Sequence, residues 1–281
     1  MQKTDLNVSP YYDDFDPADN FHRVLFRPGF AVQARELTTL QSIMQNQIEK
    51  HGRHFFKEGA MVIPGQIGFT NAYYAVKLQS TFNSASIAGY LSSYIGAVIT
   101  GSISGITARV IGVTDATTTD APTLYVKYLT SATNTASATG TTGASLANQT
   151  SDFVNGESLA ADVAISSINA GDNSSTLLTS GATLVGSSAS IQEGVYFVRG
   201  QFVRVPEQRI ILEKYSNTPS YRVGLTVAET LVTPEADTTL LDNAAGSSNI
   251  NAKGAHRLQL SLTLDKLPLG YTDDENIVEL M

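Results

Sequence analysis

The sequence contains no cysteine and no tryptophan, and only 16% of its 281 residues are charged. Without cysteine the chain has no disulfide, no thiolate zinc site and no cysteine nucleophile, which fits folding in a reducing cytoplasm. The charged fraction is well below the roughly 25% of an average soluble domain. So low a charge density indicates that much of the surface faces other protein rather than water.

Positive charge is scarce as well. The 18 basic residues are outnumbered by 26 acidic ones, which gives a net charge of −8 and a pI of about 5.0. Sequence-independent binding of nucleic acid needs clustered Lys and Arg, so nucleic acid is not an expected partner. No run of 18 apolar residues occurs, and the first residues lead into polar sequence. We therefore expect neither a membrane span nor an apolar signal core.

The middle of the chain differs from its two ends in charge and composition. Residues 81–190 carry only 2 basic and 6 acidic residues and are rich in Thr, Ser and Gly. We predict short strands there, over 94–101, 106–113 and 123–129. The low-complexity stretch 130–149 is expected to form an exposed loop.

A short repeat flanks this middle zone. The pattern E-G-x5-G-Q occurs at residues 58–66 and again at 193–201. Each copy predicts a strand, a tight glycine turn and a second strand, which together make a hairpin. We expect both hairpins in one sheet-based main domain formed by residues 33–83 and 185–270, with 84–184 inserted as a small β-sandwich or barrel.

The clearest predicted helix covers residues 33–51, with Gly52 available as its terminator. Its apolar residues fall within about 80° of one another on a helical wheel, whereas the opposite face carries amides. Two explanations stay open: the apolar stripe packs on the helix's own domain, or it meets its copy in a homo-oligomer or another subunit. Barely two heptads are visible, too few for an autonomous coiled coil. The stripe consists of Leu37, Leu40, Met44 and Ile48.

Residues 1–32 are predicted to form an extended docking arm. Within it, residues 11–21 are aromatic and acidic and follow no regular period. Aromatic side chains in such a terminus need a surface to bury against, either a partner or the chain's own body. The aromatic candidates for an interface are Tyr11, Tyr12, Phe15 and Phe21.

Signals for catalysis or metal binding are weak. The acidic residues between 13 and 19 lack the glycine and the glutamate that a calcium loop requires. His51 and His54 fit helix capping better than a metal site. No nucleophile elbow, phosphate-binding loop or dinucleotide fingerprint occurs. We therefore assign no catalytic, metal-binding or cofactor-binding residue and expect no enzymatic activity.

The C-terminal quarter holds a structured loop, a strand and a predicted helix start. Residues 240–258 are dense in Asn, Asp, Ser and Gly, and they lead into strict alternation over 258–264, which predicts a strand. The loop has a structural explanation, with ligand capture by Asp242, Asn249 or Arg257 as the alternative. A capping-box pattern at 272–275 predicts that 271–281 begins a helix or a connector.

Three stretches carry a resemblance to a known family: YDDFD at 12–16, FRPGFAVQARELT at 26–38, and LDNA to GAHR at 241–257. They resemble the DUF4815-type proteins, uncharacterised structural proteins of tailed bacteriophages common in large cyanophages with contractile tails. The similarity covers about residues 10–80 and 190–265. It implies a non-enzymatic virion component of the tail, baseplate or fibre-attachment region, made in the host cytoplasm and needing no cofactor.

We therefore expect a virion protein that assembles as a homo-oligomer and is anchored to the particle through its arm and helix. A trimer follows from analogy with phage fibres and not from the residues. The expected partners are copies of the chain and other phage tail or baseplate proteins, without membrane insertion. The alternative is a tailspike-like protein that binds or degrades a glycan of the host surface.

Overall fold

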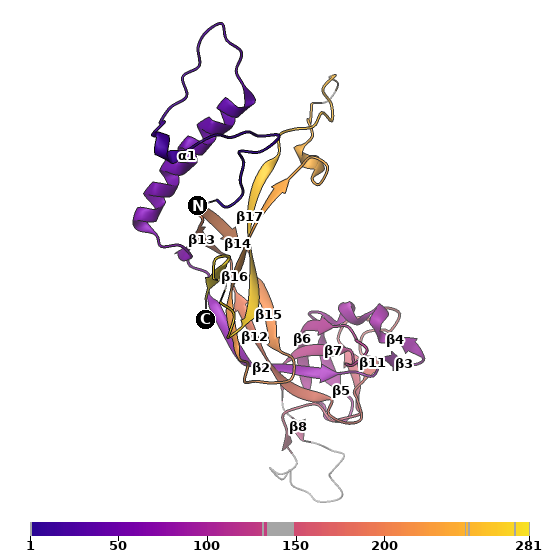
Figure 1. Ribbon diagram of the computed structural model, residues 1–281. Coiled ribbons are helices and arrows are strands. Elements are labelled where there is room, and N and C mark those ends of the chain that lie inside the picture. The colour runs from indigo at the N-terminus through magenta and orange to yellow at the C-terminus, as the bar shows by residue number, and fades with distance from the viewer. Residues whose placement is uncertain are drawn as a thin grey trace, which may run out of the picture. The chain divides into compact units, whose positions relative to one another are not determined.

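Figure 1 shows the computed structural model, which describes residues 2–130, 132–133, 149–244, 246, 248–272 and 274–280. Over these residues the chain is mainly β, with one α-helix near the N-terminus, as predicted. Most of the predicted loop 130–149 lies outside them. The chain divides into two compact units, the first formed by residues 1–68, 190–210 and 220–281 and the second by 69–189 and 211–219.

The first unit holds the α-helix and two antiparallel three-stranded sheets, ordered β1-β13-β14 and β17-β16-β18. The predicted strand 258–264 is confirmed as part of the long strand β17, in which Leu262 and Leu264 are buried. The elements of this unit are η1 (Pro17–Asp19), α1 (Ala34–Phe55), β1 (Ala60–Ile63), β13 (Gly194–Val198), β14 (Gln201–Val205), β16 (Tyr221–Val232), η6 (Thr238–Leu240), β17 (Arg257–Pro268) and β18 (Ile277–Glu279).

Helix α1 begins where predicted but ends four residues later. At its start the backbone N–H of Gln33 donates to the Glu36 carboxylate at 2.9 Å, half of a capping box. Gly52 does not end the helix, because its role is close packing: a Cβ there would lie 2.6 Å from the ring of Phe197 on β13. The helix instead ends at Phe55, after which Phe56 is extended.

The repeat forms one hairpin rather than two. The second copy is a hairpin as predicted, β13 to β14, and its two-residue turn at Arg199 and Gly200 has φ of +51° and +79°, as a type I′ turn needs. The hairpin predicted for the first copy is wrong, because β1 pairs with β13 and the chain after it joins another sheet. The copies meet at Gly65 and Gly194, where added side chains would collide with the facing backbone.

The predicted C-terminal helix is also wrong, since residues 277–279 form strand β18. β18 pairs with β16, with Val278 opposite Leu225, and the Val278 side chain is buried. So short a segment gains little as an isolated helix, whereas β-branched Ile277 and Val278 suit a strand at the free edge of β16. The strand pairing therefore outweighs the capping-box pattern before it.

The second unit is built on antiparallel strands with few charges. An eight-stranded sheet has the order β11-β10-β5-β6-β7-β2-β12-β15. Its elements are β2 (Ile67–Lys77), β3 (Thr81–Phe82), β4 (Ala85–Ser86), η2 (Ile87–Gly89), η3 (Leu91–Tyr94), β5 (Val98–Gly101), β6 (Thr107–Thr114), β7 (Thr123–Tyr128), β8 (Ala132–Thr133), β9 (Gln149–Thr150), β10 (Ser158–Ala161), β11 (Asn173–Thr176), β12 (Thr183–Ile191) and β15 (Gln208–Glu213); β2, β12 and β15 begin or end in the first unit.

Two of the three strands predicted in the middle zone are confirmed as β6 and β7. The third, predicted over 94–101, begins only at Val98, because the residues before it form η3 and bury Tyr94. The second unit also extends beyond the expected insertion 84–184. The reason is β2, whose fully buried Ala75 and Val76 contribute to two hydrophobic clusters of this unit.

A buried ion pair ties the hairpin of the first unit to both ends of the chain. The Arg199 guanidinium lies 2.6 Å from the Glu229 carboxylate of β16, and the two side chains are 7% and 5% exposed. Arg199 also donates to the Asn276 side chain at 2.6 Å, while Glu229 accepts from the backbone N–H groups of Lys3 and Thr4. Burial alone raises the pKa of Glu229, but hydrogen bonds from Thr4, Lys3 and Arg199 outweigh it and lower the pKa to about 2.

We expect Arg199→Ala to lower the free energy of unfolding by about 3–5 kcal/mol, because it leaves the Glu229 carboxylate buried without its cation. The matched control is Arg204→Ala, whose partner Glu193 is as solvent-exposed as Arg204 itself, and we expect a loss of at most about 1 kcal/mol. Urea unfolding followed by circular dichroism measures both. Equal losses in the two variants would contradict the structural role given to Arg199.

Candidate functional site on the N-terminal arm and helix

The apolar stripe of α1 lies in solvent. Leu37, Met44 and Ile48 are 52%, 59% and 51% exposed, and only Leu40 is half-buried. The chain's own domain therefore covers only part of the stripe. Amphipathic helices normally bury such a face, so the exposed stripe is an unsatisfied surface of this chain.

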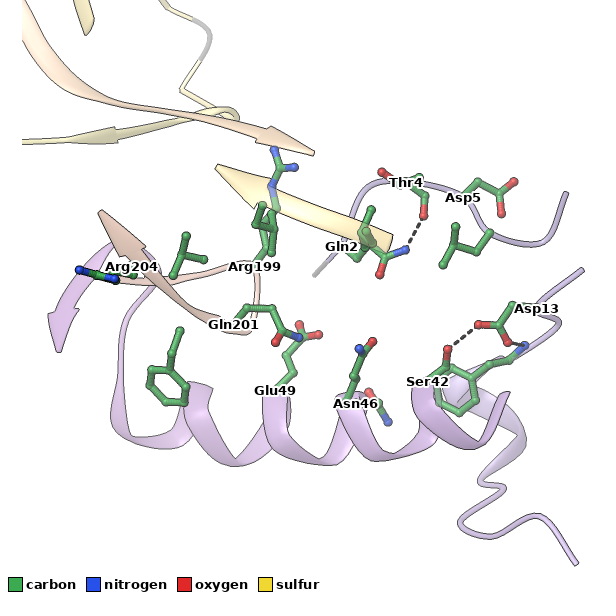
Figure 2. Close-up of a pocket in the computed structure, with 17 residues that line it drawn as sticks. Gln2, Thr4, Asp5, Asp13, Ser42, Asn46, Glu49, Arg199, Gln201 and Arg204 are labelled. Atoms are coloured by element: carbon green, nitrogen blue, oxygen red, sulfur yellow. Dashed lines mark hydrogen bonds between the residues drawn. The ribbon is translucent and has the colours of Figure 1, made fainter. Parts of the chain in front are cut away.

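The helix docks through its other side, which is largely polar. Gly52 is buried on this side, and Glu49 packs against Gly200 in the β13–β14 turn. Ile43 is buried as well, but it lies about 180° from Gly52 around the helix axis and flanks the stripe beside Leu40. In Figure 2 the side chains of Ser42 and Asn46 rise from the polar side of the helix toward the N-terminal segment and the hairpin. Polar contacts with the arm and a tight glycine contact with the hairpin thus fix the helix and turn its apolar stripe outward.

The N-terminal arm divides into a part that folds back and a part that does not. The Tyr11 hydroxyl lies 2.5 Å from Nδ1 of His256, and Phe15 is half-buried. Between them the buried Asp13 carboxylate accepts hydrogen bonds from the hydroxyls of Thr39 and Ser42 on α1. These contacts bind residues 11–15 to the chain's own body.

Beyond residue 15 the arm is largely exposed, and it forms a long loop before it enters α1 (Figure 1). Its large exposed apolar side chains lie between Phe21 and Val32. Of the predicted interface residues, Tyr12 and Phe21 lie in solvent. The sequence analysis did not predict the other exposed apolar residues of this loop. The density of apolar residues in the FRPGF segment, unusual for an exposed loop, is the signal that could have identified them. We call the arm–helix surface the exposed set Tyr12, Phe21, Leu25, Phe26, Phe30, Val32, Leu37, Met44, Ile48 and Phe55.

The weaker candidates of the sequence have structural contacts. Asp16 accepts from the backbone N–H of Ala18 at 2.8 Å and begins η1, and the rings of His51 and His54 pack edge-on against Phe55. Asp242 accepts from the Ala244 N–H within the loop 240–258. Within the described ranges no group of three His, Cys, Asp or Glu residues is placed to hold a metal ion. No helix there is long and apolar enough to span a membrane.

The second unit holds one tight charged cluster around Asp120. The Lys77 and Lys214 ammonium groups lie 3.1 and 3.2 Å from its carboxylate, and the Tyr215 hydroxyl donates to it at 2.5 Å. Burial alone raises the pKa of Asp120, but hydrogen bonds from Tyr215, Lys77 and Lys214 together lower it to about 2. Burial, followed by the hydrogen bond to Asp120, raises the pKa of Tyr215 to about 12. Both groups keep their ordinary charge at neutral pH, so the Asp120 carboxylate stays paired with the two ammonium groups and stabilises the fold.

Comparison with known proteins gives a family without a described function. The family model described as "Domain of unknown function (DUF4815)" matches residues 9–122, less than half of the chain. The matched range includes the exposed arm and α1. The comparison with curated proteins found no match, and neither did the comparison with solved structures.

We expect Asp120→Asn to lower the free energy of unfolding at neutral pH by about 2 kcal/mol. This is the free energy that corresponds to a pKa lowered from 3.8 in the unfolded chain to about 2 in the folded protein. Because the folded pKa is lowered, this contribution is complete above pH 4 and is lost as the pH falls toward 2. The melting temperatures of the two proteins should therefore converge between pH 4 and pH 2. Asp115→Asn, at an exposed position, is the control and should stay within about 0.5 kcal/mol of the wild type. A constant difference down to pH 2 would contradict this account.

Proposed function

We propose that this chain is a structural protein of a phage virion, placed in the tail, baseplate or fibre-attachment region. It assembles with copies of itself through the stripe of α1, and its exposed arm anchors it to neighbouring tail or baseplate proteins. The proposal assigns it no catalysis. The observation that carries the proposal is the arm–helix surface, a set of large apolar side chains left in solvent.

The composition of α1 supports contact between identical copies. Its residues 37–48 include no charged residue, although a free surface helix normally carries Glu and Lys. Around a symmetry axis each residue of a parallel helix meets its own copy, so a charge there would face the same charge. An uncharged stripe avoids this repulsion, and each large apolar side chain removed from water contributes roughly 1.5–3 kcal/mol.

The arm supports a second contact, with a different protein. Its apolar residues between Phe21 and Val32 lie on a loop with no regular structure of its own, and such side chains gain by burial against a partner. The resemblance to virion proteins and the DUF4815 match over the arm and helix support a tail or baseplate protein as that partner. The trimeric state rests on analogy with phage fibres.

We expect the purified chain to be an oligomer, at a multiple of the chain's own 30.0 kDa, and the double variant Met44→Glu, Ile48→Glu to be a monomer. Both residues are exposed in the single chain, so the substitutions leave its own packing intact. Light scattering coupled to size exclusion measures the mass. Lys50→Glu changes the net charge by the same amount from an exposed position outside the stripe and should keep the oligomer. A monomeric wild type, or an oligomer unaffected by the double variant, would disprove the assembly.

A further inference from the structure

The first unit contains a pocket of about 620 Å³ between α1 and the sheets, within the size range of small-molecule sites (Figure 2). Four segments far apart in the sequence line it: the N-terminal residues 2–15, the polar side of α1, the β13–β14 hairpin and the start of β17. Side chains from these segments converge on one space. The pocket is separate from the exposed stripe, because it lies on the opposite side of the helix.

Three of the five charged side chains in the pocket wall are paired with an opposite charge. Arg199 is paired with Glu229, Arg204 lies 2.8 Å from Glu193, and Glu49 binds Arg53 at 2.8 Å. The other two are carboxylates that accept hydrogen bonds from neutral donors: Asp13 from the hydroxyls of Thr39 and Ser42, and Asp5 from the Asn7 N–H. Both cations of the wall are therefore paired, and none is left for the phosphate of an anionic ligand.

What the wall offers instead is amide groups. Gln45 and Asn46 come from α1 and Gln201 from β14, and within the described part of the chain none of the three side chains forms a hydrogen bond. Figure 2 shows Asn46 and Gln201 directed into the same space from opposite walls. Each amide has a carbonyl acceptor and an NH₂ donor. Together the amides suit a ligand whose neighbouring groups both donate and accept hydrogen bonds.

The pocket lining also contains apolar side chains. Phe15, Phe202 and Leu258 are among them, and Phe202 is half exposed. Aromatic and aliphatic side chains together with amide groups suit a ligand that has both apolar and polar surface.

We propose that this pocket binds a neutral saccharide, a hexose or N-acetylhexosamine unit of a glycan. A sugar ring presents hydroxyls, each of which donates and accepts, around its edge and C–H groups on its face. This chemistry fits the amides and the apolar lining residues together, while the paired arginines and the carboxylates of Asp5 and Asp13 disfavour an anionic ligand. A peptide is less well matched, because the free groups in the wall are side-chain amides and not a row of backbone groups. The inference goes beyond the proposed function and does not depend on the assembly.

Saturation-transfer NMR on the full chain tests the site, with methyl glycosides of glucose, galactose, mannose, N-acetylglucosamine and N-acetylgalactosamine and with trialanine as the peptide probe. We expect transfer to at least one glycoside. Asn46→Leu and, independently, Gln201→Leu should weaken its binding by at least about tenfold, since each removes a hydrogen-bonding amide at similar volume. Gln47→Leu, the exposed neighbour of Asn46 outside the pocket, should bind as the wild type does.

Three results would overturn the proposal: no transfer to any glycoside, transfer to trialanine alone, or binding that both pocket variants retain. Circular dichroism checks that the variants are folded. Asn46 and Gln201 belong to different elements. If one of the two variants does not fold, the other variant still tests whether the pocket binds the glycoside. The mass of the oligomer, measured on the same samples, shows whether a loss of glycoside binding is accompanied by a loss of assembly.

Discussion

The buried pair of Arg199 and Glu229 is the contact on which the first unit depends. Arg199 sits in the turn of the β13–β14 hairpin, and its guanidinium binds β16 through Glu229 and the segment before β18 through Asn276. Its backbone N–H donates to Glu58 of the first repeat copy. Glu229 in turn holds the N-terminal residues by accepting from Thr4. Removing either charge would leave the other buried and unpaired, so four segments depend on one pair.

The same turn explains why α1 presents its apolar stripe to solvent. Gly200 follows Arg199 with positive φ, and the absence of a side chain lets Glu49 of α1 pack against it. Three residues further along the helix, Gly52 brings the backbone onto the ring of Phe197. The two glycine contacts and the Asp13 hydrogen bonds orient the helix so that its polar side faces the hairpin and the arm. The exposed stripe is therefore a consequence of how the helix is fixed.

Much of the fold could be predicted where the signal is local. Strict alternation gave β17, β-branched runs gave β6 and β7, and the periodic stripe gave α1. The errors lie where a contact with a residue far away in the sequence determines the local structure. Strand β1 pairs with β13, more than 130 residues away, and β18 adds to β16 because an edge is free there. Gly52 is a terminator by local rules, and only the ring of Phe197 makes it a packing residue.

The candidate sites divide in the same way. Periodicity identified Leu37, Met44 and Ile48 as one stripe, but their exposure depends on contacts of the opposite side of the helix, which no periodicity contains. The pocket was not predictable, since Asn46 and Gln201 come together only after the hairpin, helix and arm have docked. Because stripe and pocket occupy opposite sides of α1, a partner on the stripe does not cover the pocket. Assembly through the stripe and ligand binding in the pocket are therefore compatible with each other.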